Sequence, residues 1–267
     1  MSETSQEAGD SILLRKENGV AWITLNRPNV LNACDLPMLK KFQGALRECD
    51  SDSNVRCIVI TGAGRAFCAG VDLQSLKSRC DDQGSLGDDL REGFNPIVQR
   101  IRNSERPVIG MVNGVAAGAG MGIALACDLR FASENAKFVE AFAKIGLVPD
   151  SGATFFMPRL FGLSKTLELV FTGDGVDAQE ALRLGAVNRV FPLEKLEAET
   201  KVFAEALARG PRGLGLAKRA VNRALAMDLE SALEYEARMQ QLAGETEDYK
   251  EGVRAFTEKR PPRFRGK

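Results

Sequence analysis

The chain has 267 residues, of which 44% are hydrophobic and 27% are charged, so it can bury a full core and is not expected to be disordered. Lys plus Arg and Asp plus Glu number 36 each, and this balance excludes an overall attraction to nucleic acid or to an anionic membrane. The absence of histidine excludes a Ser-His-Asp triad, a Cys-His pair and histidine-ligated metals.

Cysteine spacing and hydropathy indicate the compartment. The six cysteines are scattered singly, without a CxxC pair or the dense spacing of a disulfide scaffold or a zinc site. Reduced thiols are therefore expected, as in a cytoplasm. The first ten residues are polar and acidic, and no run of about 18 apolar residues follows, so neither a secretory signal nor a membrane span is predicted. The sequence predicts a cytoplasmic protein without a membrane partner.

The N-terminal elements follow turn and capping signals. Strands at Ser11–Glu17 and Val20–Leu25 flank Asn18-Gly19, a strong signal for a β-hairpin. Asp35 then has the place of an N-cap for a helix that continues to about Cys49. A β-branched run at Cys57–Thr61 predicts a buried strand, and helix and strand alternate from there.

The rest of the chain is predicted as strands that give way to helices. Asn113–Gly122 is a glycine-rich turn that opens a helix through Ala126, and from about Ser151 onward the periodicity is helical. The segment Ser75–Asn95 is rich in Asp, Gly and Ser, and it is expected to be a mobile loop over a site or an exposed loop without a role. Further strands are predicted at Pro107–Val112, Leu129–Ala132, Lys137–Glu140 and Val187–Phe191.

Two small-residue turns, Ala66–Leu73 and Asn113–Gly122, each follow a predicted buried strand. Such turns leave backbone N–H groups free at a helix start, where negative charge is favoured and a ligand can approach the backbone. Tight packing of a helix on a sheet is the structural alternative. A phosphate-binding loop is a poor match, because no G-x-G-x-x-G starts at Gly118 and no G-K-[ST] follows. Two such turns could direct two donors at one oxygen.

Five ordered motifs resemble the enoyl-CoA hydratase/isomerase (crotonase) family, and together they cover nearly the whole chain. They are Ile23–Pro28 with Leu31–Ala33, Ala66–Leu73, Val112–Asp128, Phe138–Gly152 and Glu251–Arg260. The resemblance implies an α/β crotonase (ClpP/crotonase-like) fold, in which a spiral of ββα units over residues 1–193 holds coenzyme A and an oxyanion hole. It further implies that residues 194–267 form a helical region that builds a homotrimer or a dimer of trimers.

By this resemblance, the backbone N–H groups of Val71 and Ala119 hold the thioester carbonyl oxygen of an acyl-CoA as it becomes an enolate. Donors at that oxygen are worth roughly 3–4 kcal/mol each. No metal and no separate cofactor are implied, since coenzyme A is part of the substrate. Alternatively, Asp72 is a helix cap and Lys259 lies in a solvated basic tail. The residues implied to bind the substrate are Arg27, Val30, Ala66, Phe67, Ala69, Gly70, Asp72, Leu73, Gly118, Gly122 and Phe142, with Phe256 and Lys259 from a neighbouring subunit.

The chain departs from the family's hydratases at their two glutamates, which align with Gly122 and Phe142. Neither residue can move a proton, so hydration by the usual two-glutamate arrangement is not expected. Isomerases of the superfamily carry an acid at the position of Asp150, where apolar neighbours would raise the pKa of a carboxyl. The alternative is that Asp150 is the N-cap of a helix beginning near Ser151. Glu140 is the second candidate acid, with the orientation of its side chain left open.

These features favour an isomerase that moves a proton between C2 and C4 of an unsaturated acyl-CoA, a Δ3-to-Δ2 isomerisation with Asp150 as the carrier. The segment Phe138–Asp150 most resembles the 1,2-epoxyphenylacetyl-CoA isomerase-like branch, and Phe142 would suit a flat, possibly aromatic-derived acyl group. The alternatives are an enoyl-CoA hydratase that adds water, and a non-catalytic homologue that binds acyl-CoA or RNA; zero net charge argues against RNA. Cys68 is expected to be a buried hydrophobe, because it has no activating histidine.

Overall fold

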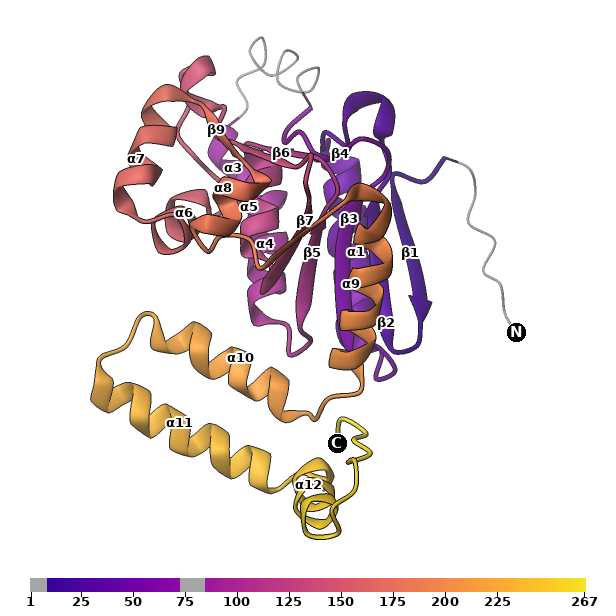
Figure 1. Cartoon of the computed structure of the whole chain (residues 1–267). Helices are drawn as coiled ribbons and strands as arrows, with labels where there is room; N and C mark the ends of the chain where they lie inside the picture. The colour runs from indigo at the N-terminus through magenta and orange to yellow at the C-terminus, as the bar shows by residue number, and fades with distance from the viewer. Residues whose placement is uncertain (1–8, 73–84) are drawn as a thin grey trace.

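The computed structural model describes residues 9–72 and 85–267, and within them two β-sheets form the centre of an α/β molecule (Figure 1). The predicted site residue Leu73 and residues 75–84 of the predicted loop Ser75–Asn95 lie outside the described residues. The first sheet contains, in spatial order, β1 (Ile12–Glu17), β2 (Val20–Leu25), β3 (Cys57–Gly62), β5 (Val108–Val112), β7 (Leu129–Ser133) and β10 (Arg189–Phe191). The second contains β4 (Ala66–Cys68), β6 (Val115–Ala117), β8 (Lys137–Val139) and β9 (Gly175–Asp177).

Strand pairing is parallel except in β1–β2 and β8–β9, which are antiparallel. Strands β3 and β5 are buried at every residue, as expected for parallel strands covered on both faces. The helices are α1 (Leu36–Ser51), α3 (Leu86–Glu92), α4 (Phe94–Asn103), α5 (Ala119–Ala126), α6 (Ala153–Leu160), α7 (Leu163–Thr172), α8 (Ala178–Arg183), α9 (Leu193–Ala208), α10 (Gly213–Ala224), α11 (Leu229–Gly244) and α12 (Glu247–Thr257), with 3-10 turns η1 (Pro28–Val30) and η2 (Phe142–Ile145).

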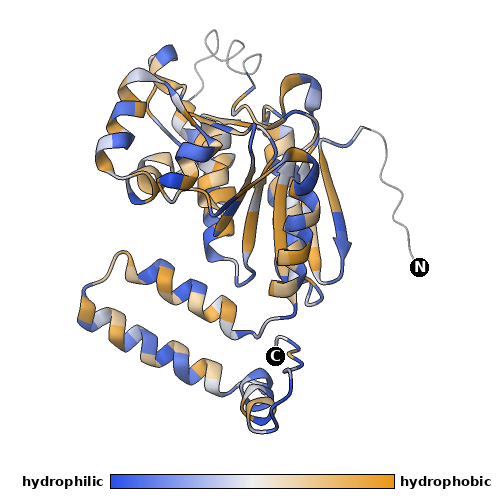
Figure 2. Ribbon diagram, in the orientation of Figure 1, coloured by the Kyte–Doolittle hydropathy of each residue, from blue (hydrophilic) through white to orange (hydrophobic). Residues whose placement is uncertain are grey.

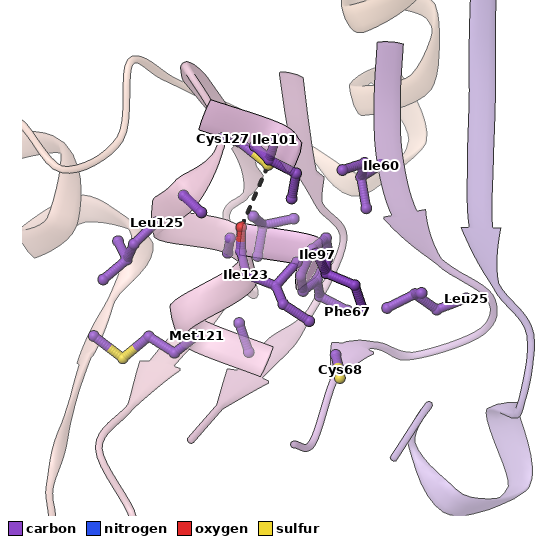
Figure 3. Packing of buried hydrophobic residues seen from close by; sticks show 14 of the residues in the cluster. Leu25, Ile60, Phe67, Cys68, Ile97, Ile101, Met121, Ile123, Leu125 and Cys127 are labelled. Atoms are coloured by element: carbon purple, nitrogen blue, oxygen red, sulfur yellow. Dashed lines mark hydrogen bonds between the residues drawn. The ribbon is translucent and has the colours of Figure 1, made fainter. Parts of the chain in front are cut away.

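Helices α1, α4 and α5 cover one face of the six-stranded sheet, where the larger hydrophobic core lies. Figure 3 shows this core, with Ile60 of β3, Phe67 of β4 and Ile97 of α4 turned toward Ile123 of α5. Every residue of α5 is buried, so its N-terminal end is fixed in position. Helix α9 covers the opposite face through a smaller cluster that includes Leu196.

The N-terminal predictions are confirmed. Asn18 and Gly19 both have positive φ, at 50° and 79°, as the two-residue turn of a tight hairpin requires. The carboxylate of Asp35 accepts a hydrogen bond of 2.9 Å from the N–H of Met38, so Asp35 is the N-cap of α1.

The predicted loop Ser75–Asn95 is wrong where the structure describes it, because α3 and the start of α4 occupy it. Helix α4 begins after Gly93 and tolerates Pro96, since a proline in the first turn removes no helical hydrogen bond. Tertiary contacts stabilise this helix, because the side chains of Phe94, Ile97 and Ile101 all pack in the core. The strand β6 inside the glycine-rich turn was also not predicted, because it pairs with β4 and β8, which are distant in sequence.

The C-terminal helices α10 to α12 extend away from the two sheets (Figure 1). Helix α9, which spans the predicted boundary at residues 193–194, packs on the six-stranded sheet instead of joining them. Hydrophobic residues recur along α10 and α11 among polar ones (Figure 2). In the part of the chain that is described, no helix is long and apolar enough to cross a membrane.

Candidate active site

A cavity of about 930 Å³ lies where the N-terminus of α5 meets α1, α3 and η2. This volume is at the upper end of that of small-molecule sites. Its wall is largely aliphatic and aromatic, with backbone groups of the two glycine-bearing turns at one side. The described lining residues are Asn29, Val30, Leu31, Ala33, Cys34, Asp35, Leu36, Leu39, Arg65, Ala69, Gly70, Val71, Asp72, Leu86, Gly87, Asp89, Leu90, Phe94, Gly118, Ala119, Ala141, Phe142, Lys144, Ile145, Leu147, Val148 and Asp150.

The first backbone donor of the cavity is the N–H of Val71. Residues 70–72 pair with Cys34 in a short parallel bridge: the N–H of Cys34 donates to Gly70 O at 2.7 Å, and the N–H of Asp72 donates to Cys34 O at 3.0 Å. Because successive residues of an extended chain direct their N–H groups to opposite sides, the N–H of Val71 points away from Cys34. No described residue accepts a hydrogen bond from it.

The second donor is the N–H of Ala119, the first residue of α5. The N–H of Gly118, which has φ 52°, is occupied by Val139 O at 3.0 Å, whereas the N–H of Ala119 has no acceptor within the helix or among the other described residues. The two turns touch, since a Cβ added at Gly70 would lie 3.4 Å from Ala119 N and 2.9 Å from Ala117 O. Two unsatisfied donors, one of them at the start of α5, thus belong to adjoining turns and can act on one oxygen.

Close packing of backbone on backbone holds these donors in place. A Cβ at Gly120 would lie 2.2 Å from Cys68 O, and a Cβ at Gly114 would lie 2.1 Å from Arg65 O. Cys68 is fully buried, and its thiol donates to Asn32 O at 3.2 Å. Any larger residue at Gly120 or Gly114 would therefore collide with the backbone of β4 or of the residue before it.

Asp150 brings a carboxylate into the same cavity. One of its oxygens accepts a hydrogen bond of 2.8 Å from the hydroxyl of Ser151. Burial raises the pKa of Asp150 above its ordinary value, and the Ser151 hydroxyl opposes that shift. The interpretation of Asp150 as a helix N-cap is wrong: α6 begins at Ala153, its N-cap is Gly152, and no side chain caps it.

Comparison with known proteins places the chain. Residues 15–267 match the family model for enoyl-CoA hydratase/isomerase. The chain belongs to the enoyl-CoA hydratase/isomerase family. It is 42% identical over 260 residues to the 1,2-epoxyphenylacetyl-CoA isomerase of Escherichia coli K12, covering 96% of this chain and 98% of the relative. It is 36% identical over 253 residues to the short-chain-enoyl-CoA hydratase of Clostridium acetobutylicum, covering 94% and 96% of the two chains.

A solved enoyl-CoA hydratase from Bacillus anthracis superposes with a TM-score of 0.88 at 32% identity, covering 97% of this chain and all of that one. The crotonase fold and the family's action on acyl-CoA substrates are thereby established for this chain. The relatives include both isomerases and hydratases, so the finer activity depends on the residues of the site.

Gly122 and Phe142, the two positions predicted to correspond to the glutamates of hydratases, lie close to the segment that carries Asp150 and to the cavity wall. A Cβ at Gly122 would lie 2.6 Å from Ser151 O, so the segment carrying Asp150 occupies the space of a side chain there. Phe142 lines the cavity, with its ring 3.5 Å from where a Cβ on Gly118 would stand. The site thus has an aromatic side chain at Phe142 and a carboxylate at Asp150.

Glu140, the second candidate acid, is fully buried and is not among the described residues that line the cavity. Neither of its carboxylate oxygens has a hydrogen-bond partner in the described chain. Burial, followed by the nearby charge of Asp150, raises the pKa of Glu140 to about 7, and the N–H of Phe142 opposes the shift without reaching hydrogen-bond geometry.

Arg27 braces the turn that carries Val71. Its guanidinium lies 2.9 Å from the carboxylate of Asp72 and 3.2 Å from that of Asp35, and it donates to Ala33 O at 2.7 Å. Arg27 itself is not among the described lining residues. Its observed contacts are therefore structural and internal to the chain.

The other predicted site residues that the structure describes divide into three groups. Val30, Ala69, Gly70, Asp72, Gly118 and Phe142 line the cavity together with the two donors and Asp150, whereas Ala66, Phe67 and Gly122 are buried behind it. Phe256 and Lys259 lie at the end of α12, and Phe256 is 87% exposed. The wall formed by Leu86, Leu90 and Phe94 was not predicted, although the spacing of four residues between them is typical of one face of a helix.

Proposed function

We propose that the protein isomerises an unsaturated acyl-CoA, with Asp150 carrying the proton and the N–H groups of Val71 and Ala119 stabilising the enolate. The observation that carries the proposal is the presence of these three groups in one cavity. The expectation that Gly122 and Phe142 stand where hydratases have glutamates supports it. Of the other carboxylates at the cavity, Asp35 and Asp72 are paired with Arg27.

The reaction is a proton transfer in two steps. The Asp150 carboxylate removes a proton from C2 of a 3-enoyl thioester, and the electron pair of the C–H bond passes through the thioester carbonyl to give a dienolate. The two backbone donors receive the charge on oxygen. Asp150 then returns the proton at C4, which leaves the double bond between C2 and C3 and regenerates the carboxylate. Its raised pKa suits this task, because a carboxylate of higher proton affinity is a stronger base.

We further propose that the acyl group is flat and apolar, and that it is derived from an aromatic ring. The aromatic side chains Phe142 and Phe94 and the aliphatic Leu86 and Leu90 line the cavity. The 42% identity to the E. coli protein named 1,2-epoxyphenylacetyl-CoA isomerase supports this substrate class. Rearrangement of a ring-opened or epoxidised aromatic thioester would use the same enolate chemistry.

The assembly is proposed to be a homotrimer or a dimer of trimers, in which Phe256 and Lys259 complete the coenzyme A site of a neighbour. Large apolar side chains are exposed along α10 to α12, and a Lys ammonium can pair with a phosphate. We also propose a cytoplasmic location, since the described cysteines are free and buried. The exposed apolar side chains are Val221, Leu225, Leu229, Leu233, Leu242, Tyr249, Val253 and Phe256.

The test is proton NMR of the purified protein with a 3-enoyl-CoA in deuterated water. The wild type is expected to exchange C2 and C4 protons and to move the double bond, and Asp150→Asn is expected to lower that rate at least a hundredfold while the thioester still binds. The control is Asp52→Asn, which removes a half-buried carboxylate at the C-cap of α1, the end of the helix away from the cavity, and should leave the rate unchanged. A 3-hydroxyacyl product would instead establish a hydratase, and binding without exchange a non-catalytic homologue.

A further inference from the structure

Glu140 is a buried carboxyl that the proposed reaction does not use. It follows β8 directly, and its N–H donates to Asp174 O at 2.9 Å. The preceding carbonyl, of Val139, accepts the hydrogen bond from Gly118 N at 3.0 Å. Glu140 is therefore tied through its neighbour to the residue that precedes the second backbone donor.

Among the described residues, no hydrogen-bond donor or cation pairs with a charged Glu140, and the nearby N–H of Phe142 opposes the effect of burial only in part. Its side chain is 0% exposed, and both carboxylate oxygens are without a hydrogen-bond partner there. Two charged residues of the adjoining segments, Lys144 and Asp174, lie 3.6 Å apart in an ion pair, with side chains 58% and 69% exposed to solvent. The remaining charged neighbour, Asp150, has the same sign. An unpaired buried anion is costly, so burial here strongly favours the neutral acid.

We propose that Glu140 is a positioning residue that acts through Asp150, holding its proton while Asp150 is ionised and stopping the reaction when it loses that proton. The inference rests on the proposed function, because it assigns the base role to Asp150. While Glu140 is neutral, the pair carries one negative charge, which neutralises when Asp150 takes the substrate proton. When Glu140 ionises, a second negative charge stands beside the site in which the enolate must form, and like charges in a buried site repel strongly.

The order of the two ionisations follows from the surroundings. Asp150 accepts a hydrogen bond from Ser151, whereas Glu140 accepts none, so Asp150 ionises first. Burial, with a further contribution from the charge of Asp150, then raises the pKa of Glu140 to about 7. The apparent pKa values belong to the pair, and substitution of either residue must shift the other.

The first experiment is a carbon-13 NMR titration of side-chain carboxyls in protein labelled at glutamate, which needs no substrate. The wild type is expected to show one glutamate carboxyl that titrates near pH 7 and is missing from Glu140→Gln. In Asp150→Asn the same signal should titrate at lower pH, because the like charge is gone. A Glu140 that is ionised at pH 6, or whose titration is unaffected by Asp150→Asn, would overturn the proposal even if the wild type had no isomerase activity.

The second experiment is the pH dependence of kcat for exchange of the substrate protons with deuterated water. The wild type should lose about tenfold in kcat between its plateau and pH 8, which is one unit above the pKa of Glu140. Glu140→Gln should keep kcat within about twofold over that range with KM unchanged, which a purely structural role would not produce. The matched control, Glu134→Gln, removes an exposed carboxylate after β7 and should keep the wild-type profile. An alkaline limb that persists in Glu140→Gln would overturn the proposal.

Discussion

The hydroxyl of Ser151 controls the proton affinity of Asp150. Its hydrogen bond of 2.8 Å stabilises the carboxylate and lowers the pKa of Asp150 against the effect of burial. Ser151→Ala should therefore raise that pKa and move the acid limb of kcat/KM to higher pH by about one unit, with about a tenfold loss below the limb. The measurement is a pH–rate profile of proton exchange.

A matched variant separates this effect from backbone strain. Ser151 has φ 51°, a conformation that a glycine adopts without cost. Ser151→Gly should move the acid limb as Ser151→Ala does, because both lack the hydroxyl, while retaining more thermal stability. A limb that stays in place in both variants would mean that the hydroxyl does not act on the base.

The same two residues mark the limit of sequence reasoning at the residue scale. The family motif predicted that Asp150 lies at the site, but the sequence could not show that Asp150 does not cap a helix. Ser151 and Gly152 both adopt positive φ and delay the helix to Ala153, and a serine gives little signal for such a conformation. The burial of Glu140 was equally hidden, because it depends on the pairing of β8 with β9, which lies more than 30 residues further along the chain.

At the scale of elements, Lys218 docks α10 against the core. Its ammonium lies 2.7 Å from the carboxylate of Asp128 and donates to the carbonyls of Ile101 and Arg106, and its side chain is only 9% exposed. Lys218→Met leaves Asp128 with a weaker partner, Arg102 at 3.6 Å, and should lower the free energy of unfolding by about 3 kcal/mol. Chemical denaturation measures this loss.

Two comparisons make the docking prediction specific. The double variant Asp128→Asn with Lys218→Met removes both charges and should recover part of the loss, since no buried charge is left unpaired. Lys195→Met, at an exposed position of α9, should change stability by less than about 0.5 kcal/mol. An equal effect of Lys218→Met and Lys195→Met would show that the buried pair does not anchor α10.

Elements were predicted well where their signals are local and poorly where they are not. The hairpin turn and the Asp35 cap depend on two to four neighbouring residues, and both are confirmed. Strand β6 has three residues and exists through its pairing with β4 and β8, so no local pattern could predict it. Helix α3 buries no residue in the core, and its short polar sequence resembled a loop.

At the scale of the whole molecule, the order and spacing of the motifs identified the fold, and two of them contain the turns that hold the backbone donors Val71 and Ala119. They leave the function of the C-terminal helices to experiment. Leu229 and Leu233 are 76% and 55% exposed on α11, which is unusual for a single soluble chain and is explained if a second subunit covers them. The proposed assembly therefore predicts a mass of three or six times the 29.0 kDa chain in solution.

Light scattering coupled to gel filtration tests this assembly. Leu229→Glu with Leu233→Glu should shift the mass toward the single chain, because burying two carboxylates at an interface costs several kcal/mol. The helix itself should survive, since a glutamate in its first turn is favoured by the helix dipole. The control, Arg238→Glu with Gln241→Glu, adds negative charge at polar positions of the same helix and should keep the wild-type mass. If Phe256 and Lys259 complete a neighbour's site, the dissociated variant should also have a KM for acyl-CoA at least tenfold above that of the wild type. A wild type that is a single chain of 29.0 kDa, with a KM equal to that of the variant, would exclude a shared site.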